Sequence, residues 1–171
     1  MSMVVTGGLR ARLIHDSIYF GIRDGLQQLG WFDPSPPRQH YPINYTYEPV
    51  ENDTEVPPNT VALSDENLSE VEAELGSSMV ETSWTYYLDF YAENDVLGKH
   101  LINDVRDILG GRMPSIGRND ASMPVWDYSQ ATPVQIFSVD IESIVVDRAH
   151  DFPKSWQRFW YSCSFIVRDA Y

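Results

Sequence analysis

The spacing of the hydrophobic residues changes within a single stretch of this sequence, residues 80–111. Over residues 80–92 the apolar residues fall mainly on even positions, which is typical of a strand with one buried and one wet face. From Leu97 onward they recur every three or four positions until the pair Gly110 and Gly111, as they do along one side of a helix. The sequence therefore predicts a strand, a short turn and a helix in direct succession.

The same stretch holds several acidic residues and a histidine, which raises the question of a metal or acid/base site. His100, Asp104 and Asp107 lie three and four positions apart, so they share one side of the predicted helix. A His/Asp pair supplies two ligands, whereas transition-metal sites usually have three or four protein ligands. We therefore expect a solvated helix face and no metal.

Residues 89–95 superficially resemble an acidic cation loop. They lack the D-x-[DN]-x-[DN]-G pattern and the closing glutamate of a calcium loop. Asp95 is expected instead to cap the N-terminus of the helix, and Glu93 is expected to favour the same positive end.

Other segments show equally regular spacing. An apolar stripe predicts a helix that ends near Gly30, formed by Leu9, Leu13, Ile14, Ile18, Ile22, Leu26 and Leu29. Alternation predicts two C-terminal strands in an antiparallel hairpin, with one buried face formed by Phe137, Val139, Ile141 and Val145 in the first strand and by Phe159, Tyr161, Cys163, Phe165 and Val167 in the second. Shorter strands are expected at residues 41–47 and 60–66, and a loop is expected at residues 110–133.

The segment 34–59 is rich in proline and acidic residues, which excludes a continuous helix. It is expected to be a long loop within one domain, residues 1–171, because the residues before it are too few for a second core. The predicted fold class is α+β: an antiparallel sheet of four to five strands, packed on one face by two helices, with long loops. The exposed edges of such a sheet invite pairing between subunits.

The charge of the chain is strongly acidic. The formal net charge is −13, and no lysine or arginine lies between Arg38 and Lys99. Such a surface repels phosphate, so sequence-specific nucleic-acid binding is disfavoured. The remaining interpretations are plain solubility, a lining past which DNA slides, or a mimic of DNA.

The sequence contains no established catalytic motif. It has no phosphate loop, no G-x-S-x-G and no H-E-x-x-H, so we expect no enzyme activity and no cofactor. Cys163 is expected to be a small buried core residue. Trp156 and Trp160 flank Arg158 and are expected to serve a core or an interface, although such an arrangement is also able to stack bases. Neither a membrane span nor a signal peptide is visible, which predicts assembly in the cytoplasm.

Three segments together resemble a known family. They are VALSDENLSEVEAELGS, LDFYAENDVLGKHLINDVRDILGG and WQRFWYSCSFIVRD. In these segments, from Val61 to the C-terminus, the chain resembles the tail terminator proteins of long-tailed (siphovirus-type) bacteriophages, particularly those that infect actinobacteria.

This resemblance implies a virion structural protein of the tail and neck. Such a subunit forms a homohexameric ring at the head-proximal end of the tail tube, ends tube growth and joins the tail to the head connector. Its partners would be the tail tube protein and the connector protein, and DNA would pass through the ring without specific binding. Glu70, Glu72 and Glu74 are the acidic residues we expect to face that channel.

Two alternatives remain open. Another head-to-tail connector protein of the neck would share the character of a small ring subunit. An acidic DNA mimic that inhibits a DNA-binding protein would instead act as a discrete monomer or dimer, and its binding would depend strongly on salt.

Overall fold

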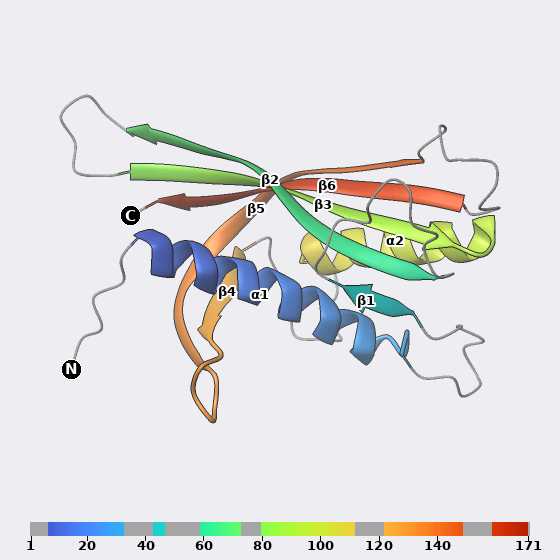
Figure 1. The fold of residues 1–171 in the computed structure, drawn as a ribbon, viewed down its shortest axis with the longest axis horizontal. Helices are drawn as coiled ribbons and strands as arrows, with labels where there is room; N and C mark the ends of the chain where they lie inside the picture. Colours follow the sequence, from blue (N-terminus) through green and yellow to red (C-terminus); the bar gives the residue numbers. More distant parts are fainter. Residues whose placement is uncertain are drawn as a thin grey trace.

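The computed structural model describes residues 7–32, 43–46, 59–72, 80–111, 122–148 and 159–170. Two helices and one six-stranded sheet form in these residues (Figure 1). The elements are α1 (Gly7–Gln28), β1 (Asn44–Thr46), β2 (Thr60–Glu72), β3 (Val80–Ala92), α2 (Asp95–Leu109), β4 (Ser122–Asp127), β5 (Val134–Arg148) and β6 (Phe159–Ala170).

The strands lie in the order β1-β2-β3-β6-β5-β4. β1 pairs with β2 in parallel, and all other neighbours are antiparallel. The predicted α+β class and the hairpin of β5 and β6 are confirmed. The prediction of a purely antiparallel sheet with four to five strands is wrong, because the short parallel strand β1 and the strand β4 both join the sheet.

Strand β4 falls inside the stretch 110–133 that was predicted to be a loop. Its side chains alternate between partly exposed and buried, and Met123 and Val125 face the core. Pro124 in its middle conceals this pattern in the sequence, because proline is usually taken to interrupt a strand. Proline is tolerated on an edge strand, where no neighbour needs its N–H, and β4 is an edge of this sheet.

Both helices contribute to one hydrophobic core with the even-numbered residues of β3 from Trp84 to Ala92. In β6 the predicted inward residues Tyr161, Cys163, Phe165 and Val167 are buried, and Phe159 is partly buried. The helices approach closely at Gly25, where an added Cβ would lie 2.9 Å from Ile108 Cδ1. Glycine at this position therefore lets α2 pack against α1 despite its cost in helix propensity.

Strand β5 contains a bulge that changes which side chains face inward. The register shifts between Glu142 and Val145, and Ser143 has a positive φ of 52°. Because an added residue reverses the alternation, Val145 is 57% exposed and the prediction that it faces the core is wrong. Val146 pairs with Cys163 instead and packs against the core. Figure 1 shows β5 and β4 bending away from the long strands and passing beside α1.

Candidate interaction surface

The acidic residues of segment 89–107 do not form one site. Asp89 accepts a hydrogen bond from Trp160 Nε1 at 2.9 Å, and Asp104 accepts one from Trp31 Nε1 at 2.8 Å. His100 is exposed and Asp107 is partly exposed. The expectation of a purely solvated face is thus wrong for Asp104, whose carboxylate holds the buried Trp31. Within the described part of the chain, no group of three or more potential ligands is placed to hold a metal ion.

The cap of α2 is Asn94, so the prediction that Asp95 is the cap is wrong. Asn94 has an extended backbone, and its side-chain oxygen accepts a hydrogen bond from the Leu97 N–H at 2.8 Å. Asp95 is the first helical residue and binds side chains instead. It accepts hydrogen bonds from Lys99 Nζ at 2.6 Å and from the Tyr161 hydroxyl, and it lies 3.5 Å from Arg148 Nη1.

These contacts set the protonation of the groups around Asp95. The hydrogen bond from Lys99, followed by that from Tyr161, lowers the pKa of Asp95. Burial, followed by the bond to Asp95, raises the pKa of Tyr161 to about 12. Burial also raises the pKa of the Cys163 thiol to about 12. Cys163 is fully buried, which confirms the prediction of a core residue.

Other residues singled out in the sequence are only partly described. Glu70 and Glu72 lie in β2 opposite Thr82 and Val80, whereas Glu74 lies outside the described residues. Their place in a channel stays a prediction. Trp160 stacks on Tyr91, with 5.9 Å between the ring centroids. Trp156, Arg158 and most of segment 34–59 lie outside the described residues.

A row of aromatic side chains crosses α1 and links its two neighbouring strands. Tyr45 of β1 stacks on Tyr19, with 4.6 Å between ring centroids, and Tyr19 meets the edge of Phe20 at 5.3 Å. Phe20 then lies 4.6 Å from Tyr128, just after β4. All four rings are partly exposed. We call Tyr45, Tyr19, Phe20 and Tyr128 the aromatic row.

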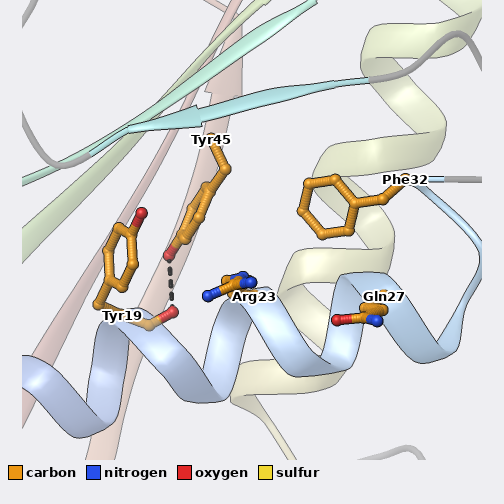
Figure 2. Close-up of a pocket in the computed structure, with 5 residues that line it drawn as sticks. All are labelled: Tyr19, Arg23, Gln27, Phe32 and Tyr45. Carbon is orange, nitrogen blue, oxygen red and sulfur yellow. Dashed lines mark hydrogen bonds between the residues drawn. The ribbon is translucent and has the colours of Figure 1, made fainter.

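A groove of about 380 Å³ opens beside this row. Its walls are Tyr19, Arg23 and Gln27 of α1, Tyr45 of β1, and Phe32 after the helix (Figure 2). The Tyr45 hydroxyl donates a hydrogen bond to the Tyr19 backbone oxygen at 3.1 Å, which fixes one wall. Arg23 and Gln27 are exposed, so the groove combines aromatic surfaces with polar hydrogen-bond donors.

The end of β4, the turn after it and the start of β5 project beyond α1 (Figure 1). We call this part of the chain, residues 126–136, the arm. Asp127 shapes its tip by accepting hydrogen bonds from the Ser129 hydroxyl at 2.6 Å and the Ser129 N–H at 2.9 Å. These bonds lower the pKa of Asp127. Val134 and Ile136 are exposed on the arm, which gives it an apolar surface.

The outer edge of β4 is poorly suited to pairing with another strand. The Trp126 N–H donates to Ser17 Oγ of α1 at 2.9 Å, and Pro124 has no N–H to donate. The expectation that exposed sheet edges provide subunit contacts is therefore weakened at this edge. The aromatic row, the groove and the arm are the better candidates for an interaction surface.

The sequence interpretation missed this surface because its residues come from four separate segments. One signal was present: Tyr19, Arg23 and Gln27 follow one another at intervals of four, which places them in a line along one side of a helix. Tyr45 and Phe32 come to lie beside this line of residues only through tertiary packing.

Comparison with known proteins adds no assignment. No protein family model matches the chain, and no curated protein is similar enough to count as a relative. Among the described residues, no helix is both long enough and apolar enough to cross a membrane.

Proposed function

We propose that this chain is a virion structural protein that forms a ring at the head-proximal end of a bacteriophage tail tube. There it would end tube growth and join the tail to the head connector, as the sequence resemblance implies. The proposal assigns the chain a role in binding other proteins and assigns it no catalysis.

The observation that carries a binding role is the aromatic row with its adjacent groove. Tyrosine, phenylalanine and arginine are enriched where proteins meet, because they offer large apolar area together with polar groups. Here Tyr19, Phe20, Tyr45 and Tyr128 remain partly exposed although the protein has a well-buried core, and Tyr19 and Tyr45 line the groove together with Arg23. Such a surface fits a subunit that contacts neighbours.

The acidic composition supports passage of DNA through the ring. A wall of carboxylates repels phosphate at short range, so DNA would not adhere to it during transit. We propose Glu70, Glu72 and Glu74 as channel-facing residues. They lie in the segment 39–98, which contains no lysine or arginine.

Electron microscopy of the purified chain mixed with tail tubes tests the proposal. Six-fold rings that cap one end of the tubes are the expected result. Binding to the portal side of the neck, with no binding to tubes, would identify another connector protein instead.

The acidic run from residue 39 to residue 98 favours one second candidate, a DNA mimic. A mimic would bind a basic, DNA-binding protein as a monomer or dimer, and its affinity would fall steeply with added salt. A chain that ignores tail tubes but shows such salt-dependent binding would support the mimic and contradict the ring.

A further inference from the structure

We infer that the groove beside Arg23 receives a carboxylate from a neighbouring copy of this chain. The inference rests on the proposed ring assembly and names the partner of the groove.

Arg23 differs from every other cation in the described part of the chain. Six of the seven described lysines and arginines lie within 4.0 Å of a carboxylate, namely Arg10, Arg12, Lys99, Arg106, Arg148 and Arg168. Among the described residues, no carboxylate pairs with Arg23. Of the cations that the structure describes, Arg23 is thus the one left for an external partner.

The surroundings of Arg23 favour a carboxylate as that partner. A guanidinium presents a planar set of N–H donors that matches the two oxygens of a carboxylate. Gln27 lies one turn further along α1 and offers an amide to the same groove (Figure 2). The rings of Tyr19, Tyr45 and Phe32 would exclude water from the pair, which strengthens a charged hydrogen bond.

The charge of the subunit indicates that the carboxylate belongs to a second copy. Each chain carries 25 acidic and 12 basic side chains, so every copy presents carboxylates that have no internal cation. Copies with a net charge of −13 also repel one another over a distance of about a Debye length, ~8 Å at physiological salt. A local contact of opposite charge would offset this repulsion, and Arg23 offers the cation for one in each copy.

The contact would also define the geometry of the assembly. The groove is formed by α1, β1 and Phe32. In a ring, the carboxylate that enters it would lie on another face of the neighbouring copy, so that each copy offers one face to each neighbour. Such a heterologous contact closes into a ring when the rotation between copies allows it.

Charge reversal at one position tests the contact. The Arg23→Glu chain should assemble at least about tenfold more weakly than the unchanged chain when masses are measured over a concentration series. The matched control is Arg12→Glu, which makes the same charge change on the same helix outside the groove, at a side chain that is 64% exposed. The control should assemble like the unchanged chain.

The outcomes separate this inference from the proposed function. Rings that persist in Arg23→Glu as well as in the unchanged chain would overturn the groove contact and leave the ring intact. An unchanged chain that stays monomeric at every concentration would overturn both. Equal weakening by both charge reversals would show a general charge effect and would also overturn the groove contact.

A second measurement identifies the partner directly. An Arg23→Lys chain, prepared in equal parts with light and heavy nitrogen, is treated with a carbodiimide, which joins an amine to a nearby carboxylate. Cross-links of mixed mass between position 23 and an acidic peptide are the expected result. Cross-links at position 23 that never mix the two isotopes would contradict a contact between copies.

Discussion

At the scale of single residues, Gly98 lets a buried tyrosine pack against α2. An added Cβ would lie 2.2 Å from Tyr161 Cε2 and 2.5 Å from Tyr161 Cδ2, far inside normal contact. We expect Gly98→Ala to lower the free energy of unfolding by about 1–3 kcal/mol through overpacking, as measured by urea denaturation.

Gly8 provides the matched control for this substitution. It also lies in a helix, but apart from the adjacent residues and its own helix backbone no atom would lie within 4 Å of its Cβ. Gly8→Ala should therefore be neutral or stabilise by up to ~1 kcal/mol. Equal destabilisation by both changes would show that the Tyr161 contact is not the cause.

Arg10 holds the end of β6 against α1. It forms a two-bond ion pair with Asp169, whose side chain is 1% exposed, and its guanidinium lies 3.6 Å from the centre of the Phe137 ring. Arg10→Ala would leave a buried carboxylate without a counter-charge, so we expect a loss of about 3–5 kcal/mol in the free energy of unfolding.

The exposed Arg12 is again the comparison. Arg12→Ala removes a surface pair with Asp16 at 3.9 Å and should cost less than ~0.5 kcal/mol. Denaturant unfolding of both variants measures the difference. A cost below ~1 kcal/mol for Arg10→Ala would contradict the account of a buried pair.

Asp95 links the stability of the protein to acid pH. The bonds from Lys99 and Tyr161 lower its pKa in the folded state. Its contribution is therefore complete above the ordinary aspartate pKa of about 4 and is lost as pH falls through the lowered folded value. Asp95→Asn should be less stable than the unchanged chain at pH 7.

The difference between the two chains should narrow as pH falls from about 4 to about 2. The measurement is the free energy of unfolding by denaturant at a series of pH values. A difference that stays constant across this range would show that the charge of Asp95 does not contribute.

At the scale of elements, the bulge in β5 determines which face of that strand is buried. Ser143 at its centre has φ of 52°, a conformation that suits glycine and strains a branched side chain. We expect Ser143→Gly to be neutral or to stabilise by up to ~1 kcal/mol, and Ser143→Val to destabilise by about 1–3 kcal/mol.

Ser138 is the control because it is exposed in an extended part of the same strand. Ser138→Val should have little effect or stabilise slightly, since valine favours strands. Thermal unfolding of these variants gives the comparison. If valine is tolerated equally at both positions, the bulge does not hold residue 143 at a positive φ.

Several elements were predictable because one uninterrupted period determines them. The alternation in β3 and β6 and the three- and four-residue spacing in α1 and α2 follow from having one buried face. Pro124 interrupts the sequence pattern of β4, so this strand was predicted to be a loop. The bulge at Ser143 reverses the alternation, so Val145 is exposed where burial was predicted. Both effects depend on the position of a strand within the sheet, which local spacing does not record.

The candidate surface was less predictable than the elements. The sequence correctly placed Cys163 in the core, but it named Asp95 as the helix cap where Asn94 caps, and it placed Asp104 in solvent where Asp104 binds Trp31. Adjacent polar residues compete for such roles, and tertiary contacts decide among them. The aromatic row joins residues 19, 20, 45 and 128, which only the folded chain brings together.

At the scale of the whole molecule, the structure combines a well-packed core with an outward-facing candidate interaction surface. The two helices and the sheet bury the large apolar side chains in one cluster. The aromatic row and the groove at Arg23 lie at the margin of this cluster, where Tyr19, Phe32 and Tyr45 pack against it. Val134 and Ile136 of the arm are exposed. A subunit of net charge −13 with this surface fits a component that works by contacting neighbours.

The central claim is that these subunits close into a ring, and native mass spectrometry of the purified chain tests it most directly. One chain has a mass of 19.6 kDa, so a hexameric ring is expected at about six times that mass. The spectrum should show this one assembly and no ladder of oligomers that grow by one chain at a time. A single species at 19.6 kDa over the full range of concentrations would contradict the claim.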